Sequence, residues 1–273
     1  MAYLVKEIFY TLQGEGLYAG KPAVFCRFSG CNLWSGREED RKSAICKICD
    51  TDFVGTNGHG GGIFEDAASL AHSVNGAFPK GKYKNIRPFV VCTGGEPLLQ
   101  LDMPLLEAFH DRNIDVAVET NGTYIPPKGI DWVCVSPKKD TELIIKSGNE
   151  LKLLYPQEGF EPEMFEKLSF DFFYLQPIYS SKLKENTLQA IEYCLHNPQW
   201  RLSLQMHKIL GLTTNISTIL KGLRTRLLKT LCAGYGFISS LPCPLSAGLL
   251  STKAPTRDVF MKGKMSKQGA FRF

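Results

Sequence analysis

The sequence has little of what marks a membrane or secreted protein. It contains no run of about 18 apolar residues, so we expect no membrane-spanning helix and no membrane partner. The N-terminal segment MAYLVKEIFYTLQGEG lacks a basic stretch followed by an apolar one, which argues against a secretory signal. The nine cysteines are odd in number and scattered along the chain, unlike a secreted disulfide framework. We therefore expect a cytoplasmic protein.

Acidic residues become scarce after Leu212. Residues 213–273 hold ten of the 32 Lys and Arg residues but one of the 27 Asp and Glu residues, so the net charge of +5 comes from this tail. The mildly acidic body over 1–212 is therefore not expected to bind nucleic acid. The tail has three interpretations: a frameshifted or misjoined segment, a disordered extension, or an appended element in which Ile219–Leu231 forms a basic amphipathic helix that binds nucleic acid or membrane.

Short β-rich segments alternate with helical patterns along the body. The predicted strands are Ala23–Phe28, Pro88–Val91, Asp115–Val118, Asp131–Val135, Glu150–Tyr155, Phe172–Leu175 and Arg201–Gln205. The predicted helices are Ile63–Ser73, Asp102–Arg112 and Asn186–His196, the last with Asn186 as its N-cap. This alternation indicates an α/β fold of parallel β/α units, and the strand count favours an incomplete barrel with mainly parallel strands.

Nearly every predicted strand ends in a polar or glycine-bearing motif, such as TGGEP at Thr93–Pro97 and SPK at Ser136–Lys138. Active sites of parallel β/α barrels gather at the carboxyl ends of the strands. We therefore expect one site at that mouth of the barrel. The segment Ser35–Gly62 has many glycines and little apolar periodicity, which is typical of a functional or mobile loop.

Three cysteines form the pattern C-x14-C-x2-C, at Cys31, Cys46 and Cys49. Thiolates bind zinc and iron–sulfur clusters alike, and His59 would complete a closed zinc site. Three thiolates on a four-iron cluster would instead leave one iron open to a cofactor. No histidine is followed two residues later by glutamate, so a zinc deaminase is not expected. Cysteines inside apolar strands, such as Cys92, are expected to be core residues.

The motif TGGEP at Thr93–Pro97 follows a strand and precedes a helix. Two glycines would let the backbone approach a ligand closely, although a strand-to-helix turn also explains them. Combined with the C-x2-C pair, the motif resembles the radical S-adenosylmethionine (SAM) superfamily, whose GGEP-type segment contacts the amine of SAM. The usual cluster motif there is C-x3-C-x2-C, and this chain departs from it in its first gap.

That expanded gap is similar to the 7-carboxy-7-deazaguanine synthase family. The similarity extends to FYTLQGEG (Phe9–Gly16), CRFSGCNLWSG (Cys26–Gly36), CDTDFVGT (Cys49–Thr56), ETNGT, SPK and LQP, in that order. It runs from about Tyr3 to Leu212, which makes 1–212 the radical SAM domain and leaves 213–273 as an atypical basic tail.

The resemblance implies a radical SAM lyase with an incomplete β/α barrel. Cys31, Cys46 and Cys49 would hold a [4Fe–4S] cluster whose open iron chelates SAM, and reductive cleavage of SAM would give a 5′-deoxyadenosyl radical. The implied substrate is 6-carboxy-5,6,7,8-tetrahydropterin, from which the radical abstracts hydrogen at C6. Ring contraction and loss of ammonia then yield 7-carboxy-7-deazaguanine for queuosine and 7-deazapurine biosynthesis. No side chain is expected to be catalytic, because the cluster and SAM carry the radical chemistry.

Binding positions also follow from the resemblance. The expected SAM contacts are Ile48, Cys49, Asp50, Gly95, Glu96, Ser136, Pro137, Lys138, Gln176, Pro177, Ile178 and Tyr179. The expected substrate contacts are Leu12, Gln13, Gly14, Glu15, Arg27, Thr93, Glu119 and Asn121. Carboxylate and carboxamide groups can pair with the amide and amino edge of a pterin, and the fork of Arg27 suits its carboxylate. A surface ion pair is the alternative for Arg27, and a capped turn is the alternative for Glu119 and Asn121.

Thr51 is implied to ligate Mg²⁺, which accepts hydroxyl oxygens and shares substrate oxygens, although a cap is the alternative role. The implied partners are a reductant protein such as flavodoxin or ferredoxin and a second copy in a homodimer. Two alternative functions stay open: a radical SAM activase of a glycyl-radical protein, and a zinc-stabilised protein whose basic tail recruits nucleic acid.

Overall fold

The computed structural model describes residues 2–79 and 86–211. The basic tail over 213–273 and the expected helix at Ile219–Leu231 lie outside the described residues. The strands are β1 (Tyr3–Leu12), β2 (Pro22–Phe28), β3 (Gly62–Phe64), β4 (Phe89–Gly94), β5 (Asp115–Thr120), β6 (Trp132–Val135), β7 (Ser147–Tyr155), β8 (Ser169–Pro177) and β9 (Trp200–Leu202). The α-helices are α1 (Ala67–Ala77), α2 (Met103–His110), α3 (Leu183–His196) and α4 (Met206–Ile209), with 3-10 turns at Glu38–Asp40, Pro97–Leu99 and Pro162–Met164.

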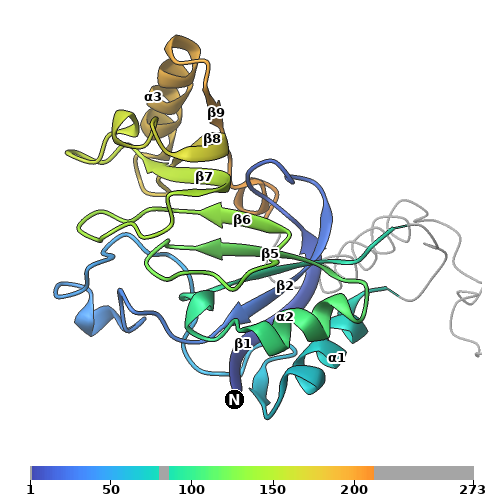
Figure 1. The fold of residues 1–273 in the computed structure, drawn as a ribbon. Helices are drawn as coiled ribbons and strands as arrows, with labels where there is room; N and C mark the ends of the chain where they lie inside the picture. The colour runs from blue at the N-terminus through green and yellow to red at the C-terminus, as the bar shows by residue number, and fades with distance from the viewer. Residues whose placement is uncertain (1, 80–85, 212–273) are drawn as a thin grey trace, which may run out of the picture. The chain divides into compact units, whose positions relative to one another are not determined.

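These strands form one sheet in the order β3-β1-β2-β4-β5-β6-β7-β8-β9 (Figure 1). Neighbours from β2 to β9 run parallel, whereas β1 is antiparallel to β2 and β3. Because β3 and β9 end the sheet without pairing to each other, it is an open α/β sheet. The expected fold, an incomplete β/α barrel with mainly parallel strands, is confirmed.

All seven predicted strands are present, but some boundaries and elements differ. The prediction missed β1 and placed Ile63 in a helix, whereas Ile63 lies in β3 and α1 begins after Asp66. The Asp66 carboxylate caps that helix by accepting from the amide of Ser69 at 2.7 Å. The predicted N-cap role of Asn186 is wrong, because α3 begins at Leu183 and the Asn186 side chain is buried. The last strand, predicted to reach Gln205, ends at Leu202.

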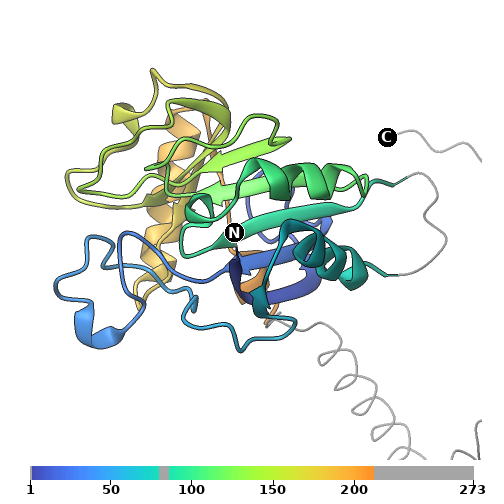
Figure 2. The same ribbon diagram turned by 60° about the horizontal axis from the view of Figure 1, so that its bottom comes forward.

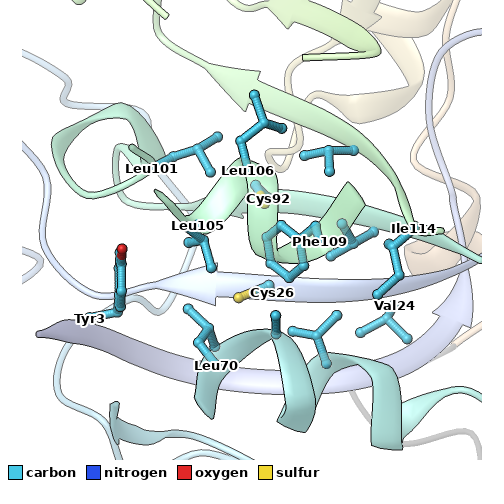
Figure 3. Packing of buried hydrophobic residues seen from close by; sticks show 14 of the residues in the cluster. Tyr3, Val24, Cys26, Leu70, Cys92, Leu101, Leu105, Leu106, Phe109 and Ile114 are labelled. Carbon is cyan, nitrogen blue, oxygen red and sulfur yellow. The ribbon is translucent and has the colours of Figure 1, made fainter. Parts of the chain in front are cut away.

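The two faces of the sheet have different neighbours. Helices α1 and α2 pack on each other and on β1, β2 and β5, and α3 packs on β8 and β9. Figure 3 shows Cys26 and Cys92 among Leu70, Leu105 and Phe109 in the first of these cores. Cys92 was expected to be a core residue, and it is fully buried. The outward side chains of the strands thus form apolar cores with the helices. The inward side chains form a separate apolar cluster that includes Phe89 and Val91, and they line the site.

The loop over 35–62 is largely irregular, as its composition indicated, and contains one short 3-10 turn. Figures 1 and 2 place this loop, drawn in light blue, at the end of the sheet toward which the arrows of β5 and β6 point. The loop that carries two of the three predicted cluster cysteines therefore lies at the carboxyl ends of the strands. Within the described ranges, no helix has the length and apolarity that crossing a bilayer requires.

Candidate active site

A cavity of about 510 Å³ opens at the carboxyl ends of the parallel strands. Its wall follows the strand periodicity, in which alternate side chains face opposite sides. On β7, Lys152 and Leu154 line the cavity, whereas Leu151 and Leu153 lie in the core beneath α3. On β2, Arg27 lines the cavity while its neighbours along the strand are buried in the other core.

Most of the residues predicted for the site are brought together around this cavity. Every expected substrate contact lines it, as does each expected SAM or metal contact apart from Cys31, Glu96, Pro137 and Pro177. The sequence prediction did not include Lys6, Glu7, Phe9, Thr11, Phe25, Asp52, Gly94, Thr120, Cys134, Lys152, Leu154, Gln205, His207 and Lys208, which also line it. One cavity therefore contacts residues from both ends of the described chain.

The thiols of Cys46 and Cys49 line the cavity and hydrogen-bond to each other. That hydrogen bond, together with the nearby charge of Lys138, lowers the pKa of Cys46 to about 6. The same hydrogen bond and burial raise the pKa of Cys49. Cys31 is partly buried and does not line the cavity, and burial raises the pKa of its thiol, with a further rise from Cys49. The three thiols therefore lie close enough to shift one another's pKa.

This donor set suits the cluster chemistry that the sequence predicted. Three thiolates beside a cavity fit an iron–sulfur cluster that leaves one iron for another ligand. Among the residues that the structure describes, no three His, Cys, Asp or Glu side chains, these cysteines included, are arranged to hold a single metal ion. His59, the predicted fourth zinc ligand, is exposed and does not line the cavity. The structure therefore does not assemble the Cys3His alternative.

Arg41 holds the C-x2-C turn in place. Its guanidinium donates to the carbonyl oxygens of Lys47 and Cys49 at 2.9 and 3.0 Å. Two further hydrogen bonds join it to the Glu38 carboxylate, and it stacks on the ring of Trp34 with a centroid distance of 4.0 Å. Arg41 thus lies in the expanded gap between the first two cysteines, and it holds the backbone around the second and third.

The double glycine at the end of β4 has a steric basis within the fold besides the close approach to a ligand that the sequence predicted. A Cβ on Gly94, where φ is +135°, would lie 2.2 Å from the carbonyl oxygen of Phe28. A Cβ on Gly95 would lie 1.9 Å from the carbonyl oxygen of Gly30 and 2.9 Å from Cβ of Cys31. Both glycines are therefore required because β4 packs on the backbone that leads into Cys31, which brings that cysteine beside Gly95.

Glu96 is completely buried and does not line the cavity. Its carboxylate accepts from the hydroxyl of Thr120 at 2.7 Å, the amide of Asn121 at 2.8 Å and the amide of Leu98 at 3.0 Å. Burial raises the pKa of Glu96, and these hydrogen bonds oppose that shift. In the structure Glu96 joins the ends of β4 and β5 instead of facing a ligand.

The Asn121 side chain forms the capped turn that was its alternative role. Its oxygen accepts from the amide and hydroxyl of Thr123 at 3.0 and 2.7 Å, and its nitrogen donates to Asn32 at 3.0 Å. Because Asn32 follows Cys31, this network ties the first cysteine segment to β5. Asn121 still lines the cavity, but its amide is already engaged.

Arg27 forms an ion pair, but the pair lies in the cavity and not on the outer surface. Its Nε donates to the Glu7 carboxylate at 2.8 Å, and the two side chains are 18% and 10% exposed. Within the described residues no acceptor reaches the Nη atoms of Arg27. The pair therefore fixes the guanidinium plane and leaves its outer nitrogens for an anion.

Lys152 pairs with two acidic residues that the sequence predicted for substrate. Its ammonium lies 2.5 Å from Oε2 of Glu15 and 3.5 Å from Oε1 of Glu119. Burial lowers the pKa of Lys152, but Glu119 and Glu15 outweigh burial and the net pKa is raised. Burial likewise raises the pKa of Glu15, and Lys152 with Gln205 overcomes it to give about 2. A raised pKa of Lys152 and a lowered pKa of Glu15 both mean that these two side chains form a charged pair.

The segment after β9 crosses the cavity beside the N-terminal loop. The amide of Met206 donates to the carbonyl of Gly14 at 3.0 Å, and a Cβ on Gly14 would lie 2.6 Å from Nδ1 of His207. Lys208 pairs with Asp50 and lies 4.0 Å above the ring of Tyr179. No local pattern in the sequence marks these contacts, since the partners are far apart along the chain.

Thr51 lines the cavity and is partly buried, so its hydroxyl is placed to meet a bound ligand. The carboxylates on either side of it are already paired with lysines: Asp50 with Lys208, and Asp52 with Lys6 at 3.0 Å. Thr51 therefore lies between two acidic side chains that are each paired with a lysine.

Comparison with known proteins adds an independent result. No protein-family model matches the chain. The chain is 56% identical over 215 residues to the 7-carboxy-7-deazaguanine synthase of Bordetella pertussis and 58% identical over 212 residues to that of Caulobacter vibrioides; each comparison covers 78% of this chain and 100% of the relative. A crystal structure of QueE from Escherichia coli matches with a TM-score of 0.57 at 27% identity, over 76% of this chain and 95% of that one.

Proposed function

Since the chain belongs to the 7-carboxy-7-deazaguanine synthase family, we propose that its cavity is the active site of a radical SAM lyase. The reaction converts 6-carboxy-5,6,7,8-tetrahydropterin to 7-carboxy-7-deazaguanine with loss of ammonia, a step of queuosine biosynthesis. The observation that supports this proposal is one cavity lined by Cys46, Cys49, Gly95 and every expected pterin contact, with Cys31 beside Gly95.

Cys31, Cys46 and Cys49 would hold a [4Fe–4S] cluster. When bound, the reduced cluster and SAM supply the hydrogen-abstracting radical. Lys138 supports this role, because it is a partly buried cation whose charge favours the thiolate of Cys46. Its ammonium is oriented by the carbonyl and hydroxyl oxygens of Ser136, at 2.7 and 2.6 Å.

Arg27 and the acidic residues opposite it would orient the substrate. The outer nitrogens of Arg27 suit the substrate carboxylate, and Glu7 keeps the guanidinium in one plane. Glu119 suits the N–H groups of the pyrimidine edge, since Gln13 donates to one of its oxygens at 3.0 Å and so fixes the carboxylate. These opposed charges would hold a pterin in one orientation relative to the cysteines.

Mg²⁺, the homodimer and the reductant belong to the proposal as well. The hydroxyl of Thr51 is the chain's candidate ligand for Mg²⁺, which would share oxygens of the substrate carboxylate and retain waters. A flavodoxin or ferredoxin would supply the electron. The body over 1–212 would carry the whole activity, with the tail over 213–273 dispensable for it.

Anaerobic reconstitution followed by a product assay tests the function. We expect about four iron per chain, SAM cleavage, and release of 7-carboxy-7-deazaguanine from the carboxylated tetrahydropterin. SAM cleavage without this product would remove the substrate and favour an activase, whereas one zinc and no iron would favour the binding protein. Running the assay also on a chain that ends at Leu212 tests the domain boundary, because lost activity would contradict it.

A further inference from the structure

A lysine is buried at the base of the cavity, and the proposed chemistry has no direct use for it. Lys152 on β7 is 4% exposed, and Glu150, which faces the same side of the strand, is 3% exposed. The ammonium meets Glu15 from the N-terminal loop and Glu119 from β5. A buried cation needs partners that stabilise it. Lys152 must in turn affect the charge and position of these two carboxylates.

The two carboxylates differ in what they still offer. Both oxygens of Glu15 are engaged, one by Lys152 and the other by Gln205 at 3.1 Å. Glu119 is engaged through Oε1 alone, by Gln13 at 3.0 Å and Lys152 at 3.5 Å. Among the described residues no donor reaches Oε2 of Glu119, and this side chain keeps 23% exposure at the cavity wall.

We infer that Lys152 is a positioning residue of the substrate site: it keeps Glu15 and Glu119 in place as carboxylates, so that the free oxygen of Glu119 accepts N–H groups from the pyrimidine edge of the substrate. The inference rests on the proposed function, because it takes a pterin-like pyrimidine as the ligand. It adds a residue that acts on the substrate through Glu119 and decides whether that acceptor is available.

The charges around the pair explain why the lysine is needed. Without it, two half-buried carboxylates would face each other, and both burial and repulsion would favour protonation of one. The other groups around them offer little compensation: burial raises the pKa of the Glu150 carboxyl and of the Cys134 thiol, and neither group can supply positive charge. From the segment after β9 come uncharged Gln205 and His207, whose pKa is lowered by burial.

The test uses the full-length chain, anaerobically reconstituted and supplied with SAM, and measures the dissociation constant of 6-carboxy-5,6,7,8-tetrahydropterin by equilibrium dialysis. K152M should weaken binding at least about tenfold near pH 6, equivalent to about 1.4 kcal/mol. Affinity should recover toward pH 8.5, because a carboxyl with a raised pKa regains its charge as the pH rises. The ratio of variant to wild type at each pH removes titration of the pterin itself.

Two variants separate charge from hydrogen bonding, and one serves as a control. K152R keeps the charge and should bind with the pH profile of the wild type, whereas K152Q keeps a donor without charge and should behave as K152M. K139M alters an exposed lysine outside the cavity, whose ammonium donates to the carbonyl of Glu158 at 2.5 Å, and should bind as the wild type. Iron content and melting temperature identify any variant that does not fold, and K152Q then replaces K152M.

The outcomes distinguish the positioning role of Lys152 from the proposed function. If the wild type binds the pterin and both uncharged variants bind it equally well, the inference is overturned and the proposed function stands. Weaker binding that is the same at every pH would also overturn it, since that result indicates a structural role alone. Failure of the wild type to bind the pterin would overturn the proposed function together with this inference.

Discussion

Replacing Glu96 with alanine tests whether this residue of the GGEP turn contacts SAM or supports the strands. The change leaves two buried donors, from Thr120 and Asn121, and a partly buried one, from Leu98, without their acceptor. Each such donor costs about 1–3 kcal/mol, and water entering the space left by the side chain would replace part of the loss. We therefore expect E96A to lower the free energy of unfolding by about 3–6 kcal/mol. That is a large fraction of the about 5–15 kcal/mol that holds a domain folded.

Urea unfolding followed by circular dichroism measures this loss, and equilibrium binding measures the affinity for SAM. E96Q keeps the shape and one acceptor oxygen, so it should lose about 1–3 kcal/mol. E107A removes an exposed glutamate on α2 and should change stability by less than about 0.5 kcal/mol. An E96A protein of near wild-type stability with weakened SAM binding would refute the structural argument and restore the ligand contact that the sequence suggested.

Three further predictions test other parts of the site. R27A should raise KM for the pterin at least about tenfold while SAM cleavage persists, because a charged contact with the substrate carboxylate is lost. C46A should abolish SAM cleavage. An equal loss of SAM cleavage in the two variants would contradict their separate roles. G94A should lower the free energy of unfolding by at least about 1–3 kcal/mol from backbone strain, since its Cβ would overlap a carbonyl oxygen at 2.2 Å, and an unchanged urea midpoint would contradict this. The pKa of Glu15, about 2 in the folded chain, lies below its ordinary value. Its pairing with Lys152 should therefore stabilise the fold fully above about pH 4.5, and this stabilisation should be lost as the pH falls toward 2. Acid unfolding of K152M should lack this pH-dependent loss.

The sequence predicted the parallel strands well because their apolar runs are local signals. Residues such as Val90 and Val91 are buried on both faces, which gives a continuous apolar run that periodicity detects. β1 was missed because it is antiparallel and lines the cavity with polar side chains such as Glu7 and Thr11. Its burial depends on the rest of the barrel, so no local rule marks it as a strand.

The site shows the same difference between residues that local motifs reveal and residues whose role depends on distant contacts. Motif residues such as Arg27 and Glu119 were predicted from the sequence and lie at the cavity. Lys152 was not, although it interrupts an apolar strand, because its partner Glu15 is 137 positions away. Glu96 shows the opposite case, since its motif position predicted a contact with SAM, whereas in the structure its carboxylate accepts hydrogen bonds at the end of β5. Spacing along the chain selects residues for a site, but long-range contacts decide their roles.

The loop that carries Cys46 and Cys49 shows how a segment without apolar periodicity can still be placed accurately. Arg41 supports the C-x2-C turn from within the loop. On one side Lys6 of β1 pairs with Asp52 and donates to a loop carbonyl at 2.8 Å, and on the other Lys208 pairs with Asp50. These polar contacts join the loop to different parts of the cavity wall, and they add to the packing of the buried Phe53 ring against Trp34 at a centroid distance of 5.7 Å. Because such contacts weaken with salt more than apolar packing does, retention of the cluster should be the most salt-sensitive property of the fold.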